Sequence, residues 1–151
     1  MMIIIHKSKK SLEVWEGGNL LGTFPIGIGK VEIGHKETEG DMRTPEGDYV
    51  VCVKNPKSKY HLSLGLNFPN NKDAEQGLKK NLITREEHDA IVDANNRLEI
   101  PLWKTKLGGE IYIHGHLEKQ SWSQGCIRMN DADIESFYDG VSIGTRVYIH
   151  P

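Results

Sequence analysis

The chain has only two cysteines, Cys52 and Cys126, and no long apolar run anywhere in its 151 residues. Small secreted domains that depend on disulfides carry more cysteines at regular spacings, and a bridge here would consume the one thiol with chemically useful neighbours. A membrane-spanning helix needs roughly 18 or more consecutive apolar residues. The sequence therefore predicts neither a disulfide framework nor a transmembrane span.

An excess of charge of either sign is also missing, because 19 Lys and Arg stand against 21 Asp and Glu, a formal net charge of −2. The densest basic cluster is Lys7, Lys9 and Lys10, which we interpret as a solvated surface turn. Without a basic stripe, nucleic acid is not an expected partner. No Cys-x-x-Cys or His-Glu-x-x-His motif occurs, so we predict no metal site and no cofactor.

The apolar pattern is mainly that of short β-strands, and the length fits a single domain over residues 1–151 with one continuous core. We expect this domain to be a monomer. The glycines of Gly17-Gly18-Asn19 favour a tight hairpin turn, and Pro45 favours a turn before the fourth strand. Strands are expected at residues 3–5, 11–16, 20–28, 48–54, 60–66, 111–115 and 146–150.

Two short helices complete the expected fold. Thr84 and Glu87 form a capping box that predicts a helix from about residue 84 to 94 within a helical pattern between residues 73 and 96. A second helix is expected from residue 130 or 131 to about 138. The fold class is therefore mainly β, a sandwich or barrel with two short helices.

The residues with the clearest chemical potential are His114, at the end of an expected strand, and Cys126, which has Gly125 and Arg128 beside it. A cysteine attacks a carbonyl as the thiolate, and its reference pKa of about 8.5 means that it needs help at neutral pH. His114 can take the proton and return it to a leaving amine, while Arg128 can lower the thiol pKa and neutralise a substrate carboxylate. The pattern predicts acyl transfer through a thioester.

Gly125 permits a sharp bend, so that amide N–H groups around Gly125 and Cys126 could face the oxyanion of a tetrahedral intermediate. Cys52 provides a contrast, because it lies in the apolar run Tyr49–Val53 without His, Gly or Arg beside it. We interpret Cys52 as a core residue of a strand.

These residues resemble the signature of the L,D-transpeptidases of bacterial cell walls, also called the YkuD or ErfK/YbiS/YcfS/YnhG domain. The family's His-Gly pair corresponds to His114-Gly115, and its Ser-His-Gly-Cys-Ile-Arg-Met corresponds to residues 123–129. Gln124 stands in place of the motif histidine, and the gap between the two blocks is shorter than usual. The loss of the motif histidine at Gln124 weakens the prediction of transpeptidation more than it weakens the prediction of cysteine chemistry.

A narrower resemblance is to the YafK-like branch of this family. Three separated blocks carry it: Arg43–Gly47, Asn55–Leu64 and Trp122–Ile127. The resemblance implies a β-rich L,D-transpeptidase fold, a peptidoglycan stem peptide as substrate, and a role in peptidoglycan biosynthesis and cell shape. It also implies a carbapenem adduct on the cysteine, and an outcome that is transpeptidation, amino-acid exchange or hydrolysis.

The expected catalytic residues are Cys126 and His114. His114 is preferred over His116 as the base because it precedes the glycine as in the family pattern. For His61, the alternatives are an ordinary hydrogen-bonded histidine and a cleft-lining role. For Trp122, they are stacking on the substrate and packing in a loop. The expected substrate-binding and oxyanion residues are Arg128, Gly125, Gln124, Ser123, Gly115, His61 and Trp122.

Two other classes of function stay open at this point. Gln124 and the shortened loop are compatible with an inactive wall-binding module, and a cysteine beside arginine is compatible with a thiol redox protein. An envelope location is implied by the resemblance, although the residues from Met1 to Lys7 are typical of a strand and not of a signal peptide. Removal of a leader, another export route and a cytoplasmic location remain alternatives.

Overall fold

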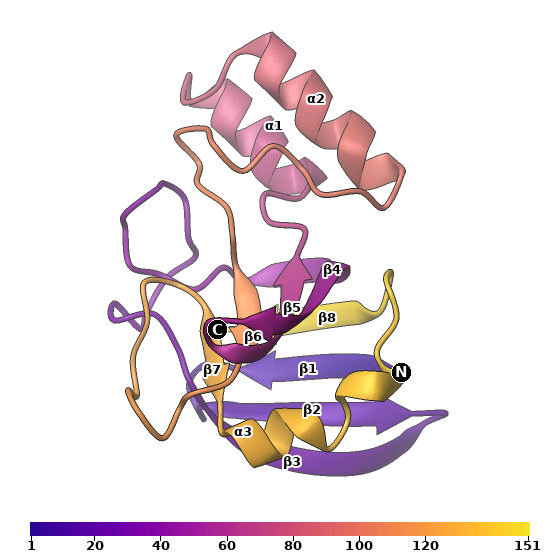
Figure 1. The fold of residues 1–151 in the computed structure, drawn as a ribbon. Helices are drawn as coiled ribbons and strands as arrows, with labels where there is room; N and C mark the ends of the chain where they lie inside the picture. The colour runs from indigo at the N-terminus through magenta and orange to yellow at the C-terminus, as the bar shows by residue number, and fades with distance from the viewer.

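Eight strands form a closed barrel in the computed structural model, which describes residues 1–151 (Figure 1). Their order around the barrel is β1-β2-β3-β7-β6-β5-β4-β8, and β8 pairs with β1 in parallel to close it. Such closure leaves no free sheet edge. The strands are β1 (Met2–His6), β2 (Ser11–Glu16), β3 (Asn19–Gly27), β4 (Gly47–Ser58), β5 (His61–Leu66), β6 (Tyr112–His114), β7 (Ile127–Met129) and β8 (Arg146–His150).

The first three strands form an antiparallel meander, as the alternating sequence predicts. Ile3 and Ile5 are fully buried while their neighbours are less so, which is the period of two expected for a strand with one face on a core. Gly17 and Gly18 both have positive φ and join β2 to β3 in a two-residue turn, so the predicted hairpin is confirmed. One cluster of 21 buried residues fills the barrel interior.

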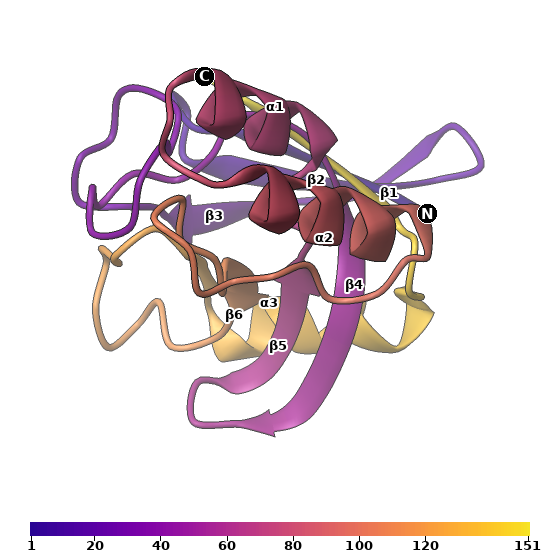
Figure 2. The same ribbon diagram turned by 90° about the horizontal axis from the view of Figure 1, so that it is seen from above.

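A helical hairpin inserted between β5 and β6 lies beyond one end of the barrel (Figures 1 and 2). It consists of α1 (Asn71–Lys79) and α2 (Arg85–Asn96), each of which begins with a capping box. The hairpin has its own small core of Ala74, Ile83, Ile91 and Leu107. The loop after α2 then returns to the barrel and enters β6.

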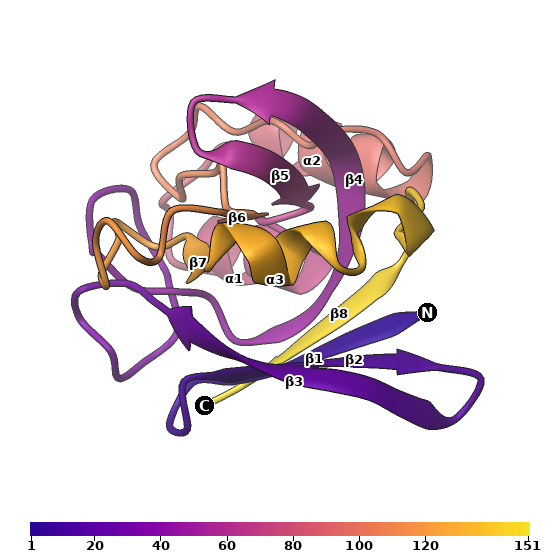
Figure 3. The same ribbon diagram turned by 60° about the horizontal axis from the view of Figure 1, so that its bottom comes forward.

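At the opposite end, α3 (Asp131–Glu135) follows β7 directly and is succeeded by the short 3-10 helix η1 (Tyr138–Gly140), as Figure 3 shows from below. Ile134 and Tyr138 are buried in the main core from this side. The predicted continuous helix over residues 130–138 is therefore divided, because Phe137 leaves the helical conformation between the two pieces.

The mainly β prediction is confirmed, and the architecture is a barrel with three α-helices where two were expected. The predicted helical pattern over residues 73–96 overlaps α1, but no separate helix was predicted there, and its capping box uses Asn70 and Asp73. The sequence prediction missed β7, which is only three residues long. None of the helices is long and apolar enough to cross a bilayer.

The interpretation of Lys7 as a solvated turn residue is wrong. Its side chain is only 2% exposed, and Nζ donates to the carbonyl oxygens of Gly34 and Thr44 at 2.8 Å each and to Glu46 Oε2 at 3.0 Å. These three acceptors match the three donors of an ammonium group. Lys7 thereby ties the loop between β3 and β4 to the barrel, whereas the other two lysines of the cluster are exposed.

Replacement of Lys7 by methionine is expected to lower the free energy of unfolding by about 3 kcal/mol, because it leaves Glu46 and two carbonyls without their buried cationic partner. Urea denaturation followed by circular dichroism measures this. Lys9→Met, at an exposed position in the same turn, should stay within about 0.5 kcal/mol of the unmodified protein. Equal stability of both variants would contradict the structural role of Lys7.

Candidate active site

The pairing of β6 with β7 places the predicted catalytic residues on one face of the sheet. The two strands are parallel, with Ile113 opposite Ile127 and His114 opposite Arg128. Both isoleucines are fully buried in the barrel core. Because side chains alternate along a strand, His114, Arg128 and Cys126 lie on the outer face.

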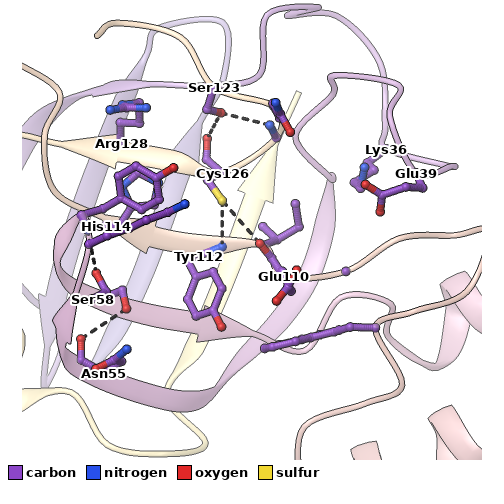
Figure 4. A pocket seen from close by; sticks show the side chains of 18 of the residues that line it. Lys36, Glu39, Asn55, Ser58, Glu110, Tyr112, His114, Ser123, Cys126 and Arg128 are labelled. Atoms are coloured by element: carbon purple, nitrogen blue, oxygen red, sulfur yellow. Dashed lines mark hydrogen bonds between the residues drawn. The ribbon is translucent and has the colours of Figure 1, made fainter. Parts of the chain in front are cut away.

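The thiol of Cys126 lies next to β6 and the segment that leads into it. The Tyr112 amide donates to Sγ at 3.4 Å, and the thiol donates to the Glu110 carbonyl at 3.4 Å. Figure 4 shows the imidazole of His114 pointing toward this sulfur. The sequence-predicted nucleophile and base therefore face each other, and Cys126 as a residue is partly exposed.

A cleft of about 1060 Å³ opens over these side chains. Its lining includes Cys126 and His114 together with Arg128 and four other predicted binding residues (Figure 4). The four are Trp122, Ser123, Gln124 and Gly125. The cleft is large enough for an extended peptide substrate.

The ring of His114 is held in one orientation and one tautomer. Its Nδ1 lies 2.8 Å from the Gly115 carbonyl, an acceptor, so Nδ1 carries the proton and Nε2 is left with a free lone pair. The ring of Tyr60 stacks on the imidazole with 4.4 Å between centroids. Only 3% of His114 is exposed. The imidazole is thus arranged to accept a proton at Nε2.

Burial makes both partners neutral in the resting site. It lowers the pKa of His114 to about 4, with further lowering from the charge of Arg128. Burial also raises the pKa of the Cys126 thiol. This effect of burial outweighs the opposing effects of the Tyr112 amide and of the positive charges of Arg128 and Lys36. Arg128 therefore acts on the thiol in the predicted direction, but the net shift is upward. The proton must leave the thiol as the sulfur attacks.

Gly115 supports the base and lies outside the cleft lining. Its amide donates to the Tyr60 carbonyl at 2.9 Å, and a Cβ at this position would approach Asp131 Oδ1 to 2.3 Å. Only glycine fits there without displacing that carboxylate. Its role is to present its carbonyl to His114, and it does not line the cleft.

The turn before Cys126 is built by hydrogen bonds from two hydroxyl groups. Ser123 Oγ accepts from the Gly125 amide and donates to the Cys126 carbonyl, while Thr44 Oγ1 donates to the Gly125 carbonyl at 2.8 Å. Gly125 has a φ of +147°, which favours glycine. The Gly125 amide is therefore already bonded, which corrects its expected role toward an oxyanion. The Cys126 amide donates to no protein acceptor.

Arg128 lines the cleft and is only 7% exposed. One of its terminal nitrogens, Nη2, donates to the His116 carbonyl at 3.3 Å, and its guanidinium lies over the Tyr60 ring at 5.5 Å. Its Nε is buried without a partner. Because Arg128 also lines the cleft, its guanidinium is suited to binding an anionic group there.

The other two predicted histidine positions lie away from the cleft lining. His61 Nε2 lies 2.8 Å from Glu135 Oε2, which fits the reading of His61 as an ordinary hydrogen-bonded histidine. His116 Nδ1 lies 3.1 Å from Asp131 Oδ1, and these two residues and Glu118 form the one group whose atoms could hold a metal ion. The same Asp131 oxygen also accepts the His116 amide, so it is already engaged.

Sequence reasoning missed the two residues that support the catalytic pair, Tyr60 and Thr44. Both lie inside the blocks Asn55–Leu64 and Arg43–Gly47 that carried the narrower resemblance, so a signal for them was present. Trp103, from the loop between α2 and β6, was missed as well. It lines the cleft and meets Tyr112 edge to face, with 5.7 Å between ring centroids.

The buried, neutral state of His114 predicts a pH dependence of stability. Between pH 6.5 and about 4 the unfolded chain binds a proton at this residue that the folded chain does not, so stability falls as the pH falls through this window. The full difference corresponds to about 3 kcal/mol. Urea denaturation from pH 7 to pH 4 should show that the free energy of unfolding falls less steeply in His114→Gln than in the unmodified protein. Identical slopes in the two proteins would contradict this prediction.

Solved structures with the same fold come from several bacteria. The helical cell shape determining protein Pgp2 from Campylobacter jejuni shares 25% identity with a TM-score of 0.68, and Bd1075 from Bdellovibrio bacteriovorus shares 21% with a TM-score of 0.64. LdtMt1, an LD-transpeptidase solved in complex with imipenem, shares 14% with a TM-score of 0.56. Each match covers 99% of this chain but 46%, 47% and 58% of the respective relative. The chain thus spans about half the length of these relatives.

The comparison with curated proteins found no match. The sequence comparison with protein families did find one, and it extends over residues 1–149. The family is described as the L,D-transpeptidase catalytic domain, YkuD, which agrees with the resemblance carried by the His114-Gly115 pair and residues 123–129. The chain therefore belongs to the L,D-transpeptidase catalytic domain family.

Proposed function

We propose that the chain catalyses cysteine-dependent acyl transfer on peptidoglycan stem peptides in the cell envelope. The observation that carries this proposal is the pair formed by Cys126 and His114 on the outer face of β6 and β7, with Nε2 of His114 free and directed toward the thiol (Figure 4). Membership in the L,D-transpeptidase family supports a peptidoglycan stem peptide as the substrate.

The reaction begins when Sγ of Cys126 attacks the carbonyl carbon of diaminopimelate, while His114 Nε2 takes the thiol proton. Because both groups are neutral at rest, proton transfer accompanies formation of the C–S bond. The negative oxygen of the tetrahedral intermediate is then placed near the unbonded Cys126 amide. When the C–N bond breaks, His114 returns the proton to the departing amine and the thioester remains.

The thioester is resolved by a second nucleophile. An amine gives a cross-link between two stems or an amino-acid exchange, and water gives hydrolysis. His114 removes a proton from the incoming nucleophile, and the thiolate of Cys126 leaves and is reprotonated. Arg128 is placed to bind an anionic group of the stem, since it lines the cleft.

The rival reading as an inactive wall-binding module depends on Gln124. In the structure Gln124 is an exposed residue of the cleft lining whose side chain makes no hydrogen bond to Cys126 or His114. The substitution therefore leaves the catalytic pair intact. This favours an enzyme over an inert module.

Incubation with a disaccharide tetrapeptide tests the proposal. We expect release of D-alanine, with chromatography of the remaining muropeptides separating cross-linked dimers from hydrolysed tripeptide. A folded protein that binds the stem and releases no D-alanine would instead support the wall-binding module. Rapid sulfenylation of Cys126 by peroxide without any acyl-enzyme would support the redox protein.

A further inference from the structure

The cleft carries a positive charge that the chain as a whole does not. Five cationic side chains line it against two carboxylates, whereas the complete chain has a formal net charge of −2. The cations are Lys36, Lys57, Lys59, Lys104 and Arg128, and the carboxylates are Glu39 and Glu110. A concave site lined by one sign of charge concentrates ligands of the opposite sign.

Three of these cations are free to act on a ligand. Lys57, Lys59 and Lys104 are exposed and take part in no ion pair. Lys36 differs, because its ammonium group is buried and bonded to the Thr38 carbonyl and Asp41. We name the three exposed residues the lysine triad.

The lysine triad comes from two separate segments that meet at the cleft. Lys57 and Lys59 lie at the tip of the β4–β5 hairpin, and Lys104 lies in the loop between α2 and β6. Lys59 Nζ lies over the Tyr60 ring at 5.2 Å, and Tyr60 stacks on His114. An anion bound by Lys59 is thus separated from the catalytic base by one aromatic ring.

We propose that the lysine triad selects peptidoglycan stems by their free carboxylates, an inference that rests on the proposed function. A stem peptide presents carboxylates at its γ-linked D-glutamate, at the second centre of diaminopimelate and at the terminal D-alanine. Stems in which these groups are amidated lack the negative charges. The substrate class of this cleft is therefore the unamidated, polyanionic stem.

The expected size of the effect follows from the exposure of the lysines. A solvent-exposed charge pair contributes a factor of roughly 1.5 to 5, so loss of all three should raise KM for the free stem by about threefold to a hundredfold. The kcat should change by less than about twofold, because none of the three touches the reacting atoms. Added salt should raise KM in the same direction, since such charges are screened.

The test compares a free tetrapeptide stem with the same stem in amidated form. The unmodified protein should prefer the free stem, and the variant K57Q/K59Q/K104Q should lose that preference through KM alone. The variant K9Q/K72Q/K79Q is the matched control, because it removes the same charge from three exposed, unpaired lysines outside the cleft. It should retain the preference.

Failure of the inference and failure of the proposed function give different results. The ratio of KM for the amidated stem to KM for the free stem is the decisive quantity. If it is the same in the unmodified protein and in K57Q/K59Q/K104Q, with D-alanine still released, the role of the lysine triad alone is overturned. No release from either stem by any protein would overturn the proposed function. Alkylation of Cys126 by the neutral reagent iodoacetamide should proceed at the same rate in all three proteins, which excludes damage to the thiol.

Discussion

Replacement of Cys126 by alanine is expected to abolish D-alanine release from a tetrapeptide stem, with a fall of at least about 10⁴-fold in kcat. Removal of the nucleophile eliminates the thioester, and losses of this order or more are typical when the nucleophile of a covalent mechanism is deleted. The measurement is the rate of D-alanine release at saturating stem concentration. Circular dichroism establishes that the variant is folded.

Cys52→Ala is the matched control for the loss of a thiol. Cys52 lies in β4, is 7% exposed, and has a pKa raised by burial to about 11, so it has no access to substrate as a thiolate. Its variant should keep activity within about twofold. Persistence of D-alanine release in Cys126→Ala would rule out the thioester mechanism.

Replacement of His114 by glutamine is expected to lower the acylation rate by about 10² to 10⁴-fold, the range that general acid and base groups contribute. Glutamine can still donate to the Gly115 carbonyl, but it cannot accept the thiol proton at the position of Nε2. Stopped-flow or quenched-flow measurement of acyl-enzyme formation separates this step from later ones.

His61→Gln serves as the control for His114→Gln, because His61 binds Glu135 and lies outside the cleft lining. Its acylation rate should remain within about threefold of the unmodified protein. An unchanged rate in His114→Gln would mean that another group takes the thiol proton, and His116→Gln would then identify whether that group is its neighbour.

Local patterns predicted much of the fold. The alternation of Ile3 and Ile5 marked a strand, Gly17 and Gly18 marked a hairpin, and the box formed by Thr84 and Glu87 marked the start of α2. Each of these signals depends on residues a few positions apart. The extent of the domain and the narrower YafK-like branch remain predictions.

The features that were missed depend on distant parts of the chain. Lys7 is buried because Gly34, Thr44 and Glu46 come to it across the fold, which no local pattern reveals. The strand β7 has three residues, too few to show a period, and exists because β3 and β6 pair with it on either side. The burial of Lys7 and the formation of β7 therefore depend on tertiary contacts, which the local sequence does not reveal.

The candidate site was predicted in its chemistry and only partly in its supports. Cys126, His114 and Arg128 were expected from residue types and spacing, and all three line one cleft. The Gly125 amide was expected to face an oxyanion, but Ser123 already accepts it. The sequence also could not show that Thr44, some eighty residues earlier, would hold the Gly125 carbonyl.

The most direct test of the central claim is the rate at which a carbapenem acylates Cys126, followed by intact-protein mass spectrometry and located by peptide mapping. We expect a single adduct on Cys126 that forms rapidly in the unmodified protein and at least about a hundredfold more slowly in His114→Gln. An adduct on Cys52, or equal rates in the two proteins, would contradict it.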